Sequence, residues 1–282
     1  MPHMTQTSSL EGTAALVTGG GSGIGLGAAR ALVRDGASVT IMGRNADKLA
    51  GAAESLRRDA AAGAVVRVSP GDVGSEEDVI AAVEAACAAT GKLDFAVAAA
   101  GDGTLGPVIS TSLDEWNRVL NVCLTGTFLT FKHAGAAMGR SGGGSLVAIS
   151  SLASSITHPF MAPYSAAKAG IDMLVKTIAD ELGQVGVRAN AVNPGIIETD
   201  LVSMITPENS VGQSYLESMP ISRFGNVDDV APLIRFLCGP ESSFITGECI
   251  TVDGGNHLRR GPNYYEFASG LYGKAADGIV EV

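Results

Sequence analysis

Three side chains in the middle of the chain could together move a proton to or from a carbonyl oxygen. Tyr164 and Lys168 are four residues apart in a segment that reads as helix, so both project from one helical face. Ser151 stands thirteen residues before Tyr164, at the end of the apolar run 145–150. A hydroxyl, a phenol and an ammonium group brought together can polarise a carbonyl and protonate it. Alone, a Tyr-x-x-x-Lys pair is weak evidence, because such pairs also occur on solvated helices.

The rest of the sequence predicts the scaffold for these residues. Short apolar runs alternate with longer Ala- and Leu-rich segments. Strict alternation predicts parallel pairing through right-handed crossovers, hence a Rossmann-type, doubly wound α/β fold with seven mostly parallel strands and helices on both faces. The predicted strands are Ala14–Thr18, Ser38–Met42, Val65–Val68, Leu93–Ala98, Ser145–Ile149, Arg188–Val192 and Cys249–Val252; the helices lie near 24–34, 46–60, 75–89, 113–138, 162–184, 200–218 and 227–237.

The domain organisation follows from where this alternation starts and stops. We expect a disordered arm over 1–9, one dehydrogenase-like domain over 10–256 and a tail over 257–282. The tail has no regular pattern but is aromatic, with Tyr264, Tyr265, Phe267 and Tyr272. It could therefore pack on its own domain or reach a neighbouring subunit.

Composition narrows the class of protein. The 282 residues are 46% hydrophobic and 17% charged, which suits a packed core, and the net charge of −10 argues against nucleic-acid or anionic-membrane partners. No run of about 18 apolar residues predicts a membrane span, and the polar start does not read as a signal peptide, so we expect a cytoplasmic protein. We interpret the scattered Cys87, Cys123, Cys238 and Cys249 as small buried residues rather than disulfides or a metal site.

A glycine-rich turn follows the first predicted strand and opens the first helix, at 18–25. Glycines permit a tight turn and let backbone N–H groups approach a pyrophosphate, and the helix N-terminus adds donors and partial positive charge. An ordinary glycine-rich turn is the alternative, but the position between strand and helix favours a dinucleotide site.

The end of the second strand bears on which dinucleotide is bound. An NAD site usually has a carboxylate there, bonded to the ribose hydroxyls. Here Arg44 occupies that region, and no carboxylate occurs until Asp47. Arg44 could hold a 2′-phosphate, so we favour NADP(H), with NAD(H) as the alternative. Arg44 could instead cap the next helix or lie in solvent; likewise Asp72 could bind adenine or form a turn, and Val73 could simply pack.

Taken in order, these motifs resemble the short-chain dehydrogenase/reductase family, in its compact single-domain branch. The resemblance covers about residues 10–256 and implies an NAD(P)(H)-dependent oxidoreductase of alcohols and carbonyls, usually a dimer or tetramer. The matching elements are the turn at 18–25, Asp72, Asn121, Ser151, Tyr164 with Lys168, Pro194-Gly195 with Thr199, and the run 252–255.

The resemblance also implies roles. Tyr164 would be the general acid in reduction and the base in oxidation, Lys168 would favour its ionised form and bond the nicotinamide ribose, and Ser151 would hold the substrate oxygen. Asn121 would fix a water or backbone carbonyl that relays protons to Lys168, and Thr199 would bond the nicotinamide carboxamide. The predicted cofactor-binding residues are Gly19, Gly21, Ser22, Gly23, Ile24, Arg44, Asp72, Val73, Ala99, Gly101, Tyr164, Lys168, Pro194, Gly195, Ile197 and Thr199.

One segment departs from the family pattern. Where the family usually has Asn-Asn-Ala-Gly after the fourth strand, this chain has Ala98-Ala99-Ala100-Gly101. The alanines therefore lack the side-chain amide that normally tethers neighbouring strands in the family. We expect a modest loss of stability or an altered cofactor affinity, with activity retained.

The substrate is poorly specified by the sequence. The loops 102–110, 152–161 and 200–222 should form the pocket and are mostly apolar, which suggests a small hydrophobic ketone or secondary alcohol; their apolar side chains are Leu105, Val108, Leu152, Ile156, Phe160, Met161, Leu201, Met204, Ile205 and Met219. His158 could touch substrate or make a local hydrogen bond. A non-catalytic NADP(H)-binding sensor or scaffold is the rival interpretation, and a carbon–carbon double-bond reductase is the runner-up among enzymes. Related enoyl reductases space Tyr and Lys more widely, so the four-residue step favours carbonyl chemistry.

Overall fold

The chain folds around one parallel β-sheet. A computed structural model describes residues 10–259, 261–262 and 264–279; the expected arm over 1–9 lies outside the described residues. The strand order is β3-β2-β1-β4-β5-β6-β7, and every pairing between them is parallel. This confirms the Rossmann-type fold predicted from the alternation of elements. The strands are β1 Ala14–Thr18, β2 Ser38–Gly43, β3 Val66–Pro70, β4 Phe95–Ala98, β5 Gly144–Ile149, β6 Val187–Pro194 and β7 Cys249–Val252.

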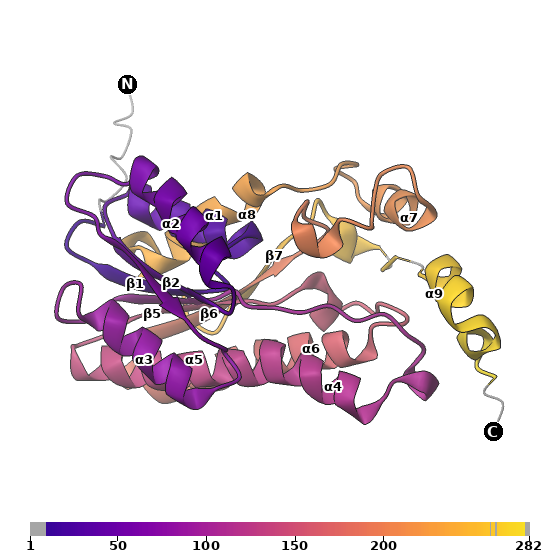
Figure 1. Ribbon diagram of the computed structural model, residues 1–282, viewed down its shortest axis with the longest axis horizontal. Coiled ribbons are helices and arrows are strands. Elements are labelled where there is room, and N and C mark those ends of the chain that lie inside the picture. Colours follow the sequence, from indigo (N-terminus) through magenta and orange to yellow (C-terminus); the bar gives the residue numbers. More distant parts are fainter. Residues whose placement is uncertain (1–9, 260, 263, 280–282) are drawn as a thin grey trace.

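Helices cover both faces of this sheet (Figure 1). On one face lie α1 Gly23–Arg34, α2 Ala46–Asp59 and α8 Val227–Cys238; on the other lie α3 Glu76–Cys87, α4 Leu113–Leu120, α5 Gly126–Arg140 and α6 Ala162–Leu182. Each face has its own apolar core, because the strands bury side chains on both sides. None of the described helices is both long and apolar enough to cross a membrane.

The helices start where the sequence offers caps. Asn45 accepts a hydrogen bond from the Lys48 backbone N–H at 2.8 Å and begins α2 directly after the turn that follows β2. Asn226 and Asp229 form a reciprocal capping box at the start of α8. These caps fix the ends of the helices that lie nearest the carboxyl edge of the sheet.

The predicted helix over 113–138 is interrupted. Between α4 and α5, Asn121–Thr125 form a π-helical turn, closed by a hydrogen bond from the Gly126 N–H to the Asn121 carbonyl. Gly126 packs closely on the loop after β3, since a Cβ there would lie 2.7 Å from Cγ2 of Val73. The extra residue in the turn lets the helix continue while Val122 faces the sheet edge and Asn121 stays exposed.

The predicted helix over 200–218 is also wrong in extent. A 3₁₀ turn at Asp200–Val202 is followed by a loop, and α7 begins only at Ser210 and runs to Ser218. Pro207 lacks a backbone donor, and Asn209 caps the new helix by accepting from the Gly212 N–H at 2.9 Å.

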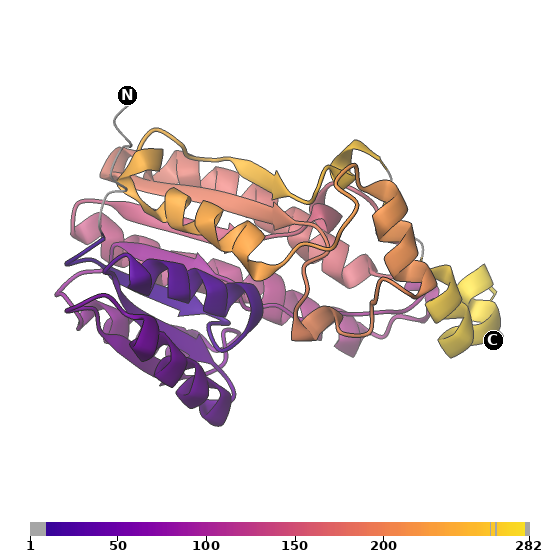
Figure 2. The ribbon, with the colours of Figure 1, turned by 90° about the horizontal axis from the view of Figure 1, so that it is seen from above.

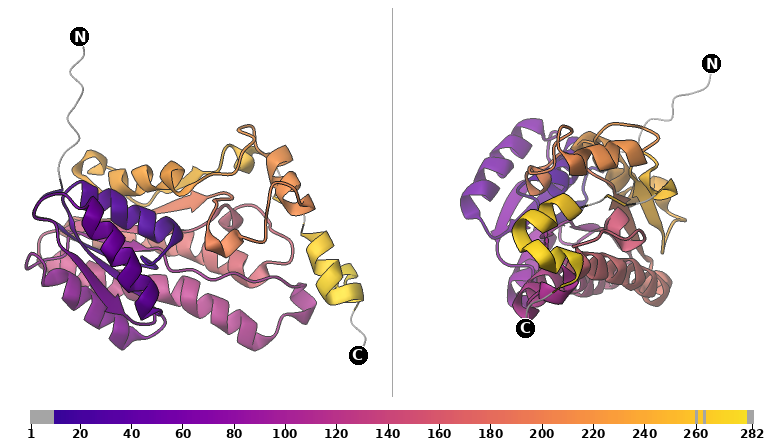
Figure 3. Two further views of the ribbon diagram at one scale, coloured as in Figure 1. Left: turned by 45° about the horizontal axis from the view of Figure 1, so that its top comes forward. Right: turned by 90° about the vertical axis from the view of Figure 1, so that its right-hand side faces the viewer.

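The C-terminal segment contains a helix that its sequence pattern does not predict. This helix, α9, spans Tyr265–Tyr272 and is followed by a 3₁₀ turn at Gly273–Asp277. It lies at the end of the molecule where the strands terminate, next to α7 (Figures 2 and 3). All four cysteines are free thiols: Cys123 and Cys238 are buried as expected, whereas Cys87 and Cys249 are only half-buried.

Candidate active site

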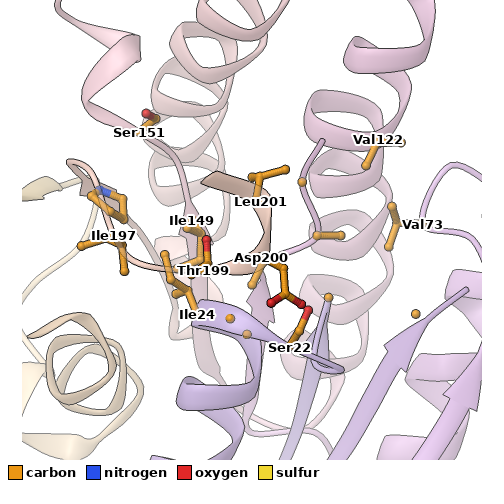
Figure 4. Close-up of a pocket in the computed structure, with 18 of the residues that line it drawn as sticks. Ser22, Ile24, Val73, Val122, Ile149, Ser151, Ile197, Thr199, Asp200 and Leu201 are labelled. Carbon is orange, nitrogen blue, oxygen red and sulfur yellow. The ribbon is translucent and has the colours of Figure 1, made fainter. Parts of the chain in front are cut away.

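A cavity of about 490 Å³ opens at the carboxyl ends of the strands. It lies where β1 pairs with β2 on one side and β4 on the other, which is the point where the strand order reverses. Open α/β sheets bind their ligands at such a point. In Figure 4, Ser22 and Ser151 lie toward opposite ends of the cavity, with Thr199 and Asp200 between them.

Backbone geometry shapes the end of the cavity nearest α1. Gly19 has φ of +66°, and a Cβ on it would lie 2.7 Å from the Ala100 nitrogen. A Cβ on Gly25 would lie 2.4 Å from the Gly19 carbonyl oxygen. Among the described residues, no side chain caps the first turn of α1, so its N–H groups remain available at the cavity wall. This glycine-lined turn against a helix N-terminus fits a pyrophosphate.

Two basic side chains line the cavity beside this turn. Arg44 follows β2 and is exposed, with no ion pair among the described residues. Lys48, one helical turn further, bonds Asp200 with its Nζ 2.9 Å from Oδ2. The hydrogen bond and charge of Lys48 lower the pKa of Asp200. The Lys48–Asp200 pair therefore links α2 to the loop after β6.

Three of the four residues predicted to act in catalysis meet at the other end of the cavity, namely Ser151, Tyr164 and Lys168. Ser151 follows β5, while Tyr164 and Lys168 lie on the first turns of α6. Lys168 is only 4% exposed, its Nζ donates to the Ile149 carbonyl at 2.7 Å, and this Nζ lies 5.4 Å from the centroid of the Tyr164 ring. A fixed ammonium group therefore stands beside the phenol.

The adjacent serines have different roles in the structure. Ser150 is buried, and its hydroxyl donates to the Lys168 carbonyl at 3.1 Å, which ties β5 to α6. The Ser151 hydroxyl instead accepts from the Ala153 N–H at 3.1 Å. Because this bond uses a lone pair, the Ser151 hydroxyl proton remains available to a ligand oxygen.

Asp72, Thr199 and Asn121 are predicted site residues whose local contacts differ. Asp72 accepts from the Gly74 N–H at 2.9 Å, as a turn residue would, yet it also lines the cavity. Thr199 stands at the N-cap position of a 3₁₀ turn, but its side chain makes no capping bond among the described residues. Asn121 lies outside the cavity wall, with its amide against Gly74: a Cβ on Gly74 would lie 2.1 Å from its Nδ2.

Most of the predicted site residues come together in this one cavity. Gly21 does not, because a Cβ on it would face Leu49 of α2 at 3.5 Å. The predicted residues that line the wall are Gly19, Ser22, Gly23, Ile24, Arg44, Asp72, Val73, Ala99, Gly101, Ser151, Tyr164, Lys168, Pro194, Gly195, Ile197 and Thr199. The sequence reasoning missed Lys48, Val122 and Asp200, among others. Lys48 could have been found from its one-turn spacing to Arg44, but its pairing with Asp200 joins segments too distant to infer.

The three predicted substrate loops form an apolar cluster beyond Tyr164. Its buried members include Tyr215 and Met219, with Leu105, Phe160, Met161 and Ile205 packed against them. Leu201 lines the cavity itself, whereas Val108 and Met204 are largely exposed. These loops therefore pack apolar side chains together, although not all the predicted side chains take part. That they bind substrate stays a prediction.

Comparison with known proteins identifies the family. A family model described as "Enoyl-(Acyl carrier protein) reductase" matches residues 19–257. The structure of a short-chain type dehydrogenase/reductase from Mycobacterium ulcerans is 43% identical in sequence, with a TM-score of 0.93 over 96% of this chain and 100% of that one. The chain belongs to the short-chain dehydrogenase/reductase family.

Two further structures that are similar to this chain contain bound ligands. A gluconate 5-dehydrogenase from Burkholderia cenocepacia, in complex with NADP and tartrate, is 31% identical with a TM-score of 0.84, covering 91% of this chain and 99% of that one. A 7α-hydroxysteroid dehydrogenase, complexed with NADH and 7-oxo glycochenodeoxycholic acid, is 32% identical with a TM-score of 0.82, covering 88% and 96%. These relatives thus include both an NADP and an NADH complex.

Proposed function

We propose that this oxidoreductase is an NADP(H)-preferring alcohol dehydrogenase or carbonyl reductase that interconverts a hydrophobic ketone or aldehyde and its alcohol. One observation carries the proposal: Ser151, Tyr164 and Lys168 line the same cavity as the glycine turn. A proton-transfer set and a pyrophosphate cradle are therefore within reach of one bound dinucleotide and one substrate.

The residues divide the work as follows. When bound, the nicotinamide cofactor supplies or accepts the hydride. Ser151 donates its free hydroxyl proton to the substrate oxygen and stabilises the charge that develops there. Tyr164 gives the same oxygen its proton in reduction and takes it back in oxidation.

Lys168 serves this chemistry from a fixed position. An ammonium group has three donors, and the Ile149 carbonyl occupies one of them. The other two can hold the nicotinamide ribose, and the ammonium group stays 5.4 Å from the centroid of the Tyr164 ring. Asn121 would act indirectly, by placing a water or backbone carbonyl in the proton path to Lys168.

The preference for NADP(H) rests on Arg44. Its exposed guanidinium stands at the cavity wall after β2, where a 2′-phosphate would need a cation. Lys48 adds a second cation one turn away. The gluconate dehydrogenase relative in complex with NADP supports this choice, while the hydroxysteroid dehydrogenase complex with NADH keeps NAD(H) as the alternative.

Reduction of a carbon–carbon double bond is the second candidate, because the matching family model is described as an enoyl reductase. The four-residue spacing of Tyr164 and Lys168 favours carbonyl chemistry. A non-catalytic sensor is the rival outside enzymes, since a fold can be kept without its activity. That rival gives no reason for Ser151, Tyr164 and Lys168 to meet.

We also propose that the protein works in the cytoplasm as a homotetramer or homodimer. Four free thiols suit a reducing compartment. Phe128 on α5 and Met173 on α6 are exposed, and they give these neighbouring helices an apolar surface for a second subunit.

The test is a panel of hydrophobic ketones, aldehydes and enones assayed with NADPH and NADH in parallel, followed by the loss of cofactor absorbance. We expect ketones to be reduced and NADPH to be preferred. Turnover of enones alone would favour the second candidate, and NADPH binding without any turnover would favour the sensor.

A further inference from the structure

The C-terminal segment follows the residues that match the family model, and its helix α9 lies at the same end of the molecule as α7 (Figure 3). Gly261 passes so close to the 152–161 loop that a Cβ on it would lie 2.3 Å from the Thr157 carbonyl oxygen. Further along, the Tyr272 hydroxyl donates to the Leu105 carbonyl at 2.5 Å. The segment therefore contacts two of the loops predicted to bind substrate, and the described part of it packs on its own domain.

Phe160 marks where these pieces meet. It is the only described non-glycine residue with positive φ, at +69°. Its carbonyl accepts from the Gly106 N–H at 2.8 Å, and its ring lies 6.4 Å from that of Tyr265, centroid to centroid. The hydrogen bond from Gly106 and the ring contact with Tyr265 therefore hold Phe160 in a backbone conformation that L-residues rarely adopt. Such strain often accompanies functional loops.

Two tyrosines pair at the centre of this apolar cluster. Tyr215 of α7 and Tyr264, just before α9, are 5% and 6% exposed, and their hydroxyl oxygens are 3.1 Å apart. One phenol proton forms this bond, so the pair keeps one further O–H donor and free lone pairs. Buried polar groups normally find partners. Among the described residues, the bond between the two hydroxyls is the one hydrogen bond that either of them makes.

The pair belongs to an apolar cluster against which Met161 packs, and Met161 stands at the N-cap of α6, the helix that carries Tyr164. Burial raises the pKa of Tyr264 to about 12, the Tyr215 hydrogen bond opposes this shift, and repulsion from Tyr164 adds to it. Burial raises the pKa of Tyr215 well above its ordinary value, with further contributions from Tyr264 and then Tyr164. Both phenols are therefore neutral at physiological pH.

His158 completes the polar surroundings. Its ring lies 6.3 Å from that of Tyr215, and its Nδ1 is 2.9 Å from the Ile156 carbonyl, so Nδ1 must carry a proton. Burial lowers the pKa of His158, which keeps the ring neutral. The three polar groups of this region are thus uncharged, and they suit an uncharged oxygen better than a carboxylate or phosphate.

We propose that Tyr215 and Tyr264 are specificity-determining residues that bind a second, uncharged oxygen of an otherwise hydrophobic substrate, a hydroxyl or carbonyl set apart from the reacting one. This inference rests on the proposed carbonyl chemistry. The segment beyond the family match thereby gives this enzyme its own selectivity.

The test compares decalone with a set of hydroxydecalones, which share its carbon skeleton and add one hydroxyl. We expect at least one hydroxydecalone to have a kcat/KM about tenfold above that of decalone. Tyr264→Phe should abolish this advantage, mainly through KM, while decalone kinetics stay within about twofold. Tyr215→Phe should act in the same way, which guards against a folding defect in a single variant.

Tyr265→Phe is the matched control, since Tyr265 is exposed on the same segment and bonds Asp277. It should leave the advantage intact, and NADPH affinity should be unchanged in all three variants. If no hydroxydecalone is preferred, or if the preference survives both Tyr215→Phe and Tyr264→Phe, the inference is wrong while the carbonyl reductase assignment stands. If the wild-type enzyme reduces no ketone with either cofactor, the proposed function fails, and this inference fails with it.

Discussion

The two ends of the cavity differ in which atoms shape them: backbone atoms at one end and side chains at the other. At the cofactor end, backbone atoms of one short turn do the shaping: Gly19 and Gly25 leave no room for a Cβ, and the first turn of α1 presents its N–H groups. At the substrate end, side chains from α7, the 152–161 loop, the loop after β4 and the C-terminal segment meet. A backbone-built site tolerates little change of residue type, whereas a side-chain-built site can be altered one residue at a time.

This difference explains how one fold can keep its cofactor while it changes its substrate. Tyr164 stands at the junction, because it lines the cavity and follows Met161, which packs against the cluster that contains Tyr215 and Tyr264. Substitutions at the junction, at the cofactor end and in the strands between them should therefore have separable effects.

The largest effect is expected at the junction. Tyr164→Phe removes the proton donor without changing the shape of the ring, so kcat for ketone reduction should fall by about a thousandfold. NADPH affinity, followed by cofactor fluorescence, should change by less than about threefold, because the hydroxyl is not part of the pyrophosphate cradle. An equal loss of binding and turnover would show that the two ends are not separable.

At the cofactor end, Gly19→Ala should disturb binding more than any change at the substrate end. The new Cβ meets backbone atoms at 2.7 Å in a residue with φ of +66°, so the turn must move. We expect roughly thirtyfold weaker NADPH binding and a loss of about 1–3 kcal/mol in the free energy of unfolding.

Gly51→Ala is the control for this change. Gly51 lies in α2 with no atom within 4 Å of its Cβ position, so alanine should be neutral or add up to about 1 kcal/mol of stability. Normal NADPH binding by Gly19→Ala would remove the distinction between the two ends.

The choice between NADPH and NADH should depend on the Arg44 side chain, although backbone atoms shape most of this end of the cavity. Arg44→Ala should weaken NADPH at least tenfold, about 1.4 kcal/mol, and leave NADH nearly unchanged. Arg58→Ala on α2, where Arg58 pairs with Glu54, removes the same charge away from the cavity and should change neither affinity. Equal losses for NADPH and NADH would contradict a phosphate clamp.

The smallest effect is expected for a substitution at Ala99, directly after β4. Ala99→Asn restores the amide that the family usually has, and one added hydrogen bond should raise the free energy of unfolding by roughly 0.5–1.5 kcal/mol or alter the NADPH Kd a few-fold. Ala99→Ser, polar but too short to reach a neighbouring strand, should not. An unchanged Tm and Kd in Ala99→Asn would mean that the missing amide has no consequence.

The sequence predicts the end of the cavity at the glycine turn far better than the end formed by α7, the loops and the C-terminal segment. The alternation of strands and helices was enough for the sheet, and β1 and β7 have the predicted bounds. The glycine turn could be placed because its residues are contiguous. The break before α7 was missed because a helical pattern continues through the loop that Pro207 and Asn209 interrupt.

Contacts between distant segments had no signal in the sequence. Lys48 and Asp200 are paired in space but far apart along the chain, and Tyr215 meets Tyr264 only because the C-terminal segment folds back. The π-helical turn at Asn121–Thr125 ends where Gly126 packs against Val73, a contact that no local periodicity reveals.

The most direct test of the central claim uses NADPH carrying deuterium at its transferable position, with a ketone that the wild-type enzyme reduces. The account predicts an alcohol with one deuterium on the former carbonyl carbon, detected by mass spectrometry and NMR, and almost none with Tyr164→Phe. Deuterium delivered instead to the carbon–carbon double bond of an enone, or NADPH bound without any transfer, would contradict it.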